Sequence, residues 1–179
     1  MTSPLVERVV LVDEQDHELG SAEKLAAHES GHLHRAFSVF VLDEDDRLML
    51  QRRANGKYHS PGLWSNTCCG HPRPGEPVVD AAQRRLFEEM GFACPLGFEF
   101  SFLYRAELGN GLTEHELDHV LTGRFSGEPR PDPSEVGAWR VASVAEVQAE
   151  LASDPAAYSA WFPLAFQGLI DRGWPRPTD

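Results

Sequence analysis

The stretch GHPRPGEPVVDAAQRRLFEEMGF, residues 70–92, decides the fold. Its second half, residues 78–90, carries apolar residues at helical spacing, and Gly91 follows at the position that favours glycine after a helix end. The sequence therefore predicts a loop that leads into a helix over 78–90. Glu88 and Glu89 end that helix, where carboxylate oxygens suit a hard divalent cation. The alternative is an amphipathic helix with a solvated acidic end.

The spacing of this stretch resembles the Nudix box, G-x5-E-x7-R-E-U-x-E-E-x-G-U, in which U is a bulky aliphatic residue. The matching positions are Gly70, Glu76, Arg84, Leu86, Glu88, Glu89, Gly91 and, loosely, Phe92. Arg85 departs from the pattern, because Nudix hydrolases carry a glutamate there that helps to bind Mg²⁺. A cation at this position should weaken hydrolysis and attract an anionic substrate. The resemblance implies an α+β fold, a Nudix-like α/β/α sandwich with a mixed central sheet.

The flanking segments predict strands and short helices around one long loop. Strands are expected over 5–12, 34–42, 47–52, 98–107, 112–125 and 138–142. Helices are expected over 24–28, with Ser21 as the cap after a turn at 13–20, over 143–151, and over 160–172, where Pro163 disturbs the helix. Residues 54–77 hold four prolines and four glycines and should be mostly loop. We expect a single domain over 1–179, with a short extension at 1–7 and a mobile tail at 174–179.

The composition excludes several classes of protein. The 179 residues include 16 basic and 28 acidic side chains, a net charge of −12 that disfavours non-specific nucleic-acid binding. No apolar run approaches the ~18 residues that span a membrane. Three cysteines, two of them adjacent, make a poor disulfide framework and favour the cytoplasm. Eight histidines indicate metal chemistry, although scattered surface histidines would give the same count.

Other segments carry a second, more specific resemblance. They are EKLAAH (23–28), LHRAFSVF (33–40), QRRANGKY (51–58), LWSNTCCGHP (63–72), RRLFEEMG (84–91), LYRAE (103–107), LTEHELDHV (112–120) and AWFP (160–163). Over roughly residues 8–172 the chain resembles the type 1 isopentenyl-diphosphate isomerases. This resemblance implies the interconversion of isopentenyl and dimethylallyl diphosphate in isoprenoid biosynthesis, through a carbocation-like intermediate. It also implies a prenyl diphosphate as the small-molecule partner, no nucleic acid or membrane, and a monomer or weak dimer.

The resemblance implies one divalent ion, Mn²⁺ or Zn²⁺, bound by three histidines and two glutamates. The matching residues are His28, His34, His71, Glu114 and Glu116. The two glutamates alternate along a predicted strand, so both carboxylates face one side. His32 is a neighbouring alternative, but the LHRAFS frame favours His34. The remaining histidines, His17, His59, His115 and His119, are expected at the surface or behind the ligands.

The family places a catalytic cysteine immediately before Gly-His, which is Cys69 in this sequence. The resemblance implies that Cys69 and Glu116 exchange protons with opposite faces of the substrate and that Tyr104 orients the pair. Which of the two gives the first proton stays open. Cys68 is expected to be a small buried hydrophobe.

For the diphosphate, the resemblance implies a set of cations and an ion of Mg²⁺. The matching cations are Lys24, Arg53, Lys57 and Arg85, and Glu89 matches the Mg²⁺ ligand. Trp161 matches a tryptophan whose ring stabilises the developing cation, a role compatible with core packing. Two rival functions remain at this point: a Nudix hydrolase of diphosphates, and a non-catalytic module that binds a metal or a diphosphate.

Overall fold

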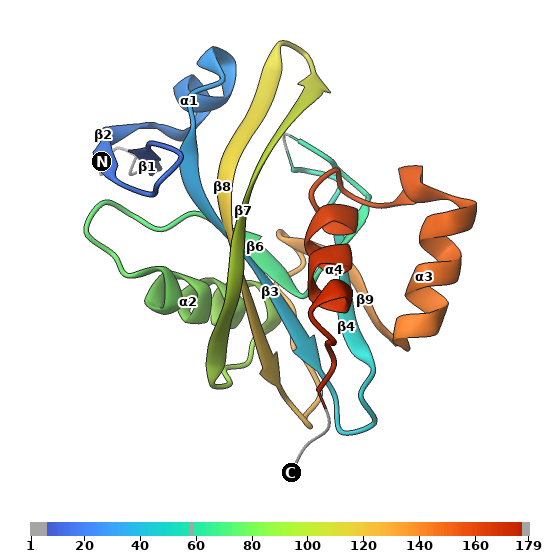
Figure 1. Ribbon diagram of the computed structural model, residues 1–179. Coiled ribbons are helices and arrows are strands. Elements are labelled where there is room, and N and C mark those ends of the chain that lie inside the picture. Colours follow the sequence, from blue (N-terminus) through green and yellow to red (C-terminus); the bar gives the residue numbers. More distant parts are fainter. Residues whose placement is uncertain (1–6, 58, 177–179) are drawn as a thin grey trace.

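The computed structural model describes residues 7–57 and 59–176 (Figure 1). These residues form a mixed nine-stranded sheet with helices on both faces. The strands are β1 (Arg8–Val12), β2 (Glu18–Glu23), β3 (His34–Leu42), β4 (Leu48–Arg53), β5 (Trp64–Ser65), β6 (Cys68–Gly70), β7 (Leu96–Gly109), β8 (Leu112–Arg124) and β9 (Val136–Ala142). The helices are α1 (Lys24–Ser30), α2 (Val78–Met90), α3 (Val144–Ser153) and α4 (Phe162–Asp171), with a short 3-10 turn at Pro155–Ala157. The predicted α+β class with a mixed sheet is confirmed.

Strand β3 is the centre of the sheet because it is paired with strands on both sides. It runs parallel to β8 from His34, opposite Glu116, to Leu42, opposite Arg124. The other pairings are antiparallel: β8 with β7, β3 with β6, and β4 with β9. The parallel register places two of the predicted metal ligands side by side on neighbouring strands.

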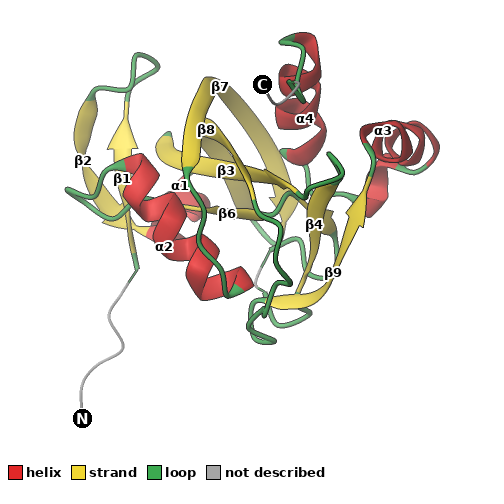
Figure 2. Ribbon diagram, turned by 90° about the horizontal axis from the view of Figure 1, so that it is seen from below, coloured by secondary structure: helices red, strands yellow, loops and turns green. Residues whose placement is uncertain are grey.

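The side chains on the two faces of β3 pack into two separate hydrophobic cores. Phe40 and Leu42 pack with α4, whereas Val39 and Val41 pack with α2. Figure 2 shows α2 on one side of the sheet and α3 and α4 on the other. Because side chains alternate along a strand, a strand covered on both faces is apolar at consecutive positions, as β3 is over residues 39–42.

Helix α2 spans the predicted residues 78–90 and is anchored by Leu86 and Met90, both fully buried. It ends at Gly91, which has a φ of 73° and donates its backbone N–H to the carbonyl of Phe87. A Cβ atom at Gly91 would lie 2.2 Å from the carbonyl oxygen of Arg130. Both the backbone conformation and the close approach therefore require glycine there.

The N-terminal segment differs from the prediction. Residues 13–20 do not form one long turn, because the Asp13 carboxylate accepts the backbone N–H groups of Gln15 and His17 and closes a tight one. The chain then returns as β2, in which Ser21 pairs with Val10. The predicted Ser21 cap is therefore wrong: α1 begins after Glu23, which makes no side-chain capping bond.

The C-terminal segment also differs in detail. Pro163 lies in the first turn of α4, where proline is tolerated, so it does not disturb the helix. Trp174, expected at the start of a mobile tail, is only 7% exposed and packs beside Phe40 with ring centroids 6.2 Å apart. Residues 1–6 and 177–179 of the predicted extension and tail, and residues 5–6 of the first predicted strand, lie outside the described residues.

Candidate active site

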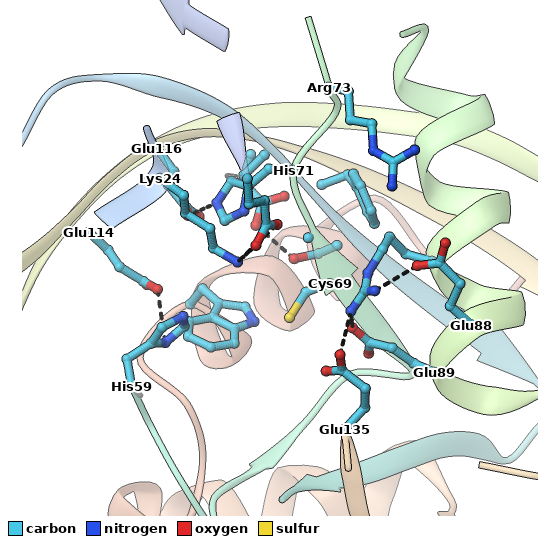
Figure 3. Close-up of a pocket in the computed structure, with 18 of the residues that line it drawn as sticks. Lys24, His59, Cys69, His71, Arg73, Glu88, Glu89, Glu114, Glu116 and Glu135 are labelled. Carbon is cyan, nitrogen blue, oxygen red and sulfur yellow. Dashed lines mark hydrogen bonds and ion pairs between the residues drawn. The ribbon is translucent and has the colours of Figure 1, made fainter. Parts of the chain in front are cut away.

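A cavity of about 670 Å³ opens where β3, β6 and β8 meet the start of α1 and the end of α2 (Figure 3). In Figure 3 the histidines, Glu114, Glu116 and Lys24 lie on one side, and Arg73, Glu88, Glu89 and Glu135 lie on the other. In Figure 3 Cys69 lies between the two groups. The cavity therefore combines an end rich in possible metal ligands with an end where basic side chains and carboxylates form ion pairs.

Four predicted metal ligands form one buried group. They are His28 from α1, His34 from β3, His71 directly after β6, and Glu116 from β8. Their ligand atoms all lie within 4.8 Å of one another. His71 Nε2 lies 2.8 Å and His34 Nε2 lies 3.4 Å from Glu116 Oε1.

The histidine rings are oriented by backbone carbonyls. His28 Nδ1 lies 2.7 Å from the carbonyl oxygen of Lys24, and His34 Nδ1 lies 2.8 Å from that of His32. Each ring therefore donates its N–H to the backbone and carries a lone pair on Nε2, the arrangement of a metal-binding histidine. His34 Nε2 is buried and makes no hydrogen bond to the residues that the structure describes. The donor set therefore fits a divalent metal. His32 is exposed and contributes only this carbonyl.

Glu114 and Glu116 both point into the site, as the alternation predicts, and Tyr104 joins them. Its hydroxyl donates to Glu114 Oε2 and lies 2.9 Å from Glu116 Oε2. Burial raises the pKa of Glu114 well above its ordinary value. Burial acts in the same direction on Glu116, but the neighbouring imidazoles of His34 and His71 outweigh it and hold its pKa well below the ordinary value. Neighbouring carboxyls thus have opposite protonation preferences.

The sequence analysis missed Asp118, which continues the alternation of Glu114 and Glu116. It is 1% exposed, and Ser38 Oγ donates to its Oδ2 at 2.7 Å. Burial raises its pKa to about 8. The period-two pattern along β8 was the signal that would have identified it.

His59, expected at the surface or behind the ligands, lies against two of the predicted ligands, His28 and Glu114. It is 8% exposed, and its Nδ1 lies 3.4 Å from Glu114 Oε1. With His28 and Glu114 it forms a second group whose ligand atoms lie within 4.8 Å of one another. Burial, reinforced by the charge of Arg53, lowers its pKa to about 2. No sequence pattern pointed to it, because a single histidine in an irregular loop has no periodicity.

The other three histidines lie away from the two groups. The side chain of His17 is 76% exposed. His115 Nδ1 lies 3.0 Å from the carbonyl oxygen of Gly31, and His119 Nε2 lies 3.0 Å from Asp16 Oδ2.

The adjacent cysteines point to opposite sides of β6. Cys68 is fully buried in the core beside α2, whereas Cys69 lines the cavity, with Arg53 Nη1 3.7 Å from its sulfur. Burial raises the pKa of the Cys69 thiol to about 12, although the charge of Arg53 opposes this. A thiol with that pKa keeps its proton at neutral pH, so Cys69 faces the cavity as a thiol and not as a thiolate.

All four predicted cations line the cavity. Arg85 Nη1 lies 2.6 Å from Glu88 Oε2, and Arg85 Nη2 lies 2.5 Å from Glu89 Oε1 and 3.3 Å from Glu135 Oε1. The remaining contacts join Lys57 to Glu135, and Lys24 Nζ to Glu7 Oε2 at 3.1 Å. Glu89, which also accepts a hydrogen bond from Gln51, lies at this end and not with the histidines. No sequence pattern pointed to Glu135, which lies in the loop before β9.

Trp161 faces both the cavity and the core. It is 3% exposed, and its Nε1 donates to Asn66 Oδ1 at 3.0 Å. The Arg53 guanidinium lies 5.3 Å from the centre of its ring. The buried ring agrees with the expected core packing, and it also borders the cavity.

The arrangement of the sheet is shared with solved structures. The crystal structure of DR0079 from Deinococcus radiodurans matches with a TM-score of 0.74 at 21% identity, covering 90% of this chain and 98% of that one. A MutT NUDIX hydrolase from Burkholderia pseudomallei matches with a TM-score of 0.62 at 21% identity, and the match covers 76% of this chain and 98% of that one. At these identities the likeness concerns the fold alone.

Sequence comparison is more specific. The NUDIX domain model matches residues 32–162. Isopentenyl-diphosphate Delta-isomerase 1 of Aromatoleum aromaticum is 53% identical over 166 residues, covering 93% of this chain and 92% of the relative. The isopentenyl-diphosphate Delta-isomerase of Burkholderia multivorans is 54% identical over 156 residues, which cover 87% of this chain and 89% of the relative. The chain therefore belongs to the isopentenyl-diphosphate Delta-isomerases of the NUDIX family.

Proposed function

We propose that this chain interconverts isopentenyl diphosphate and dimethylallyl diphosphate in isoprenoid biosynthesis, as the name of its relatives indicates. The observation that carries the proposal is the position of Cys69 in one cavity, between buried carboxylates and a cluster of cations. A diphosphate anchored at the cationic end would place its short hydrocarbon tail near Cys69 and Glu116.

The reaction moves a double bond without changing the composition of the molecule. One proton is added to the terminal carbon, and another is removed from the carbon next to the oxygen-bearing one. Alkenes are weak bases, so the site must supply a positioned acid and exclude water. Cys69, whose thiol stays protonated, and Glu116, which stays ionised, are the proposed acid–base pair, and Tyr104 holds Glu116 through its hydroxyl.

The cationic end suits a diphosphate that must be retained. Lys24, Arg53, Lys57 and Arg85 are the proposed ligands of its oxygens, and Glu89 is the proposed carboxylate for Mg²⁺. Arg85 is the feature that separates this function from hydrolysis. It forms ion pairs with Glu88 and Glu89 at the position where the hydrolases have a further metal-binding carboxylate.

His28, His34, His71, Glu114 and Glu116 are the proposed ligands of one Mn²⁺ or Zn²⁺ ion. When bound, such an ion supplies positive charge that lowers the proton affinity of nearby groups. Trp161 borders the same space, and its ring face is suited to a developing carbocation.

The proposed setting is the cytoplasm, with a monomer or weak dimer acting on a small prenyl diphosphate and no nucleic-acid or membrane partner. The net charge of −12 and the three free cysteines support this setting. Within residues 7–57 and 59–176, none of the helices has the length and apolar character needed to cross a membrane.

A reaction with isopentenyl diphosphate and Mg²⁺ in D₂O tests the proposed function. We expect dimethylallyl diphosphate that carries solvent deuterium, and no release of phosphate or diphosphate. Mass spectrometry of the product and a phosphate assay can be run on the same sample. Stoichiometric phosphate release with a deuterium-free prenyl chain would instead identify a hydrolase.

A further inference from the structure

His59 lies against the proposed metal site although neither the Nudix box nor the proposed proton transfer uses it. Its ring is stacked on that of His28, with centroids 5.8 Å apart and an interplanar angle of 23°. Its Nδ1 lies 3.4 Å from Glu114 Oε1, and its ring meets the edge of Trp161 at 6.0 Å. Figure 3 shows His59 and Glu114 pointing toward one another.

The backbone holds His59 in this position. The buried guanidinium of Arg53 donates from Nη2 to the carbonyl oxygen of His59 at 3.2 Å. The loop is closed at its base, where Gly62 donates to the carbonyl of Arg53 and Arg53 donates to that of Leu63. These hydrogen bonds hold the backbone at His59 and at the base of the loop, and the His59 ring is directed toward Glu114 of β8.

The two ligand groups, His28–His34–His71–Glu116 and His28–His59–Glu114, share one histidine. His28 Nδ1 donates to the carbonyl of Lys24 at 2.7 Å, so this ring offers Nε2 alone. A nitrogen lone pair binds one ion, and two ions therefore cannot both be bound by His28. Within each group the ligand atoms lie within 4.8 Å of one another, close to the about 4.2 Å that separates opposite ligands of an ion with bonds of about 2.1 Å. The six residues do not form one such group, so a single ion would draw the two groups together around the shared His28.

We propose that His59 is a further ligand and that both groups bind a single divalent ion through four imidazoles and two carboxylates. This inference rests on the metal site proposed above and adds one residue to it. Six ligands favour an ion that accepts octahedral geometry, such as Mn²⁺, over Zn²⁺, which proteins usually hold with four.

The test uses the full chain, stripped of metal with a chelator, and titrates Mn²⁺ by calorimetry. The variants are His59→Ala, His59→Gln, which keeps most of the side-chain volume, and His17→Ala as an exposed control. We expect one ion per wild-type chain and a Mn²⁺ Kd raised by more than about 100-fold in both His59 variants, because the loss of a ligand should exceed the about 10- to 100-fold effect of residues that only support ligands. The His17 variant should bind like the wild type.

X-ray absorption at the bound metal provides a readout that needs no variant to be stable. Four imidazoles in the wild type and three in His59→Ala would support the inference. Three in the wild type, an unchanged Kd in both His59 variants, or two ions per chain would overturn it. A wild-type chain that binds no metal would overturn the whole proposed site, whereas metal binding without His59 would overturn only this inference.

Discussion

At the scale of single residues, the adjacent cysteines show how a strand assigns different roles to identical side chains. Val39 lies opposite Cys68 in the sheet and Ser38 lies opposite Cys69. The first pair faces the α2 core and the second faces the cavity. Cys68 and Cys69 carry the same thiol group, so the face of β6 on which each side chain lies distinguishes the two cysteines.

Replacing each cysteine in turn tests this assignment. We expect Cys69→Ala to lower kcat by about 10²- to 10⁴-fold, the contribution of a positioned proton donor. Cys68→Ala should keep most of the activity and lose only the packing of one small group, roughly 1 kcal/mol of stability. Steady-state rates and urea unfolding of both variants provide the measurement. Loss of activity confined to Cys68→Ala would contradict the assignment.

At the scale of elements, the loop before α2 is attached to the helix by an ion pair within the Nudix box. Glu76 accepts from Arg84 Nε at 2.7 Å and from Nη2 at 2.8 Å, and also from the backbone N–H of Arg73 at 2.9 Å. The hydrogen bonds from Arg84 are the main reason why the pKa of Glu76 lies below its ordinary value. This pair fixes the loop that carries His71.

We expect Glu76→Gln to lower the free energy of unfolding by about 1 kcal/mol at pH 7. Because the folded pKa lies below the unfolded one, the contribution is present above the unfolded value of about 4.3 and is lost as the pH falls through the folded value. The difference in the free energy of unfolding between variant and wild type should therefore become smaller in acid. Urea unfolding at several pH values measures it, with exposed Glu128→Gln as the control. A gap that is constant with pH would show that the ion pair is not its cause.

The elements differ in how well the sequence predicted them. Strand β3 and helix α2 follow from local periodicity, because each buries a regular set of apolar residues. Strand β2 was missed because Glu18–Glu23 has no buried alternation and is held mainly by backbone pairing with β1. The position of His59 could not be predicted from the sequence either, because it depends on where a loop meets a distant strand.

At the scale of the whole molecule, the proposed metal site joins parts of the chain that are far apart. His28 belongs to α1, His34 to β3, His71 to the loop after β6, and Glu116 to β8. Within the N-terminal segment, β1 touches β3 at only one register position, Leu11 opposite His34. A bound ion would therefore cross-link this segment to the central strands.

Removing the metal should consequently destabilise the entire fold. A ligand that binds only the folded state at 100 times its Kd adds about 2.7 kcal/mol, which for a chain of this size corresponds to about 5–10 °C in Tm. We expect a chelator to lower the Tm of the metal-loaded protein by that amount and to speed amide hydrogen exchange most in α1, whose His28 the ion would anchor. His71→Ala should unfold at a temperature that the chelator does not change, whereas His17→Ala should respond like the wild type. Scanning calorimetry and hydrogen exchange provide the two measurements. An equal Tm with and without chelator would mean that the protein alone organises the histidines. A lowered Tm with unchanged exchange in α1 would mean that the ion stabilises the central strands without the N-terminal segment.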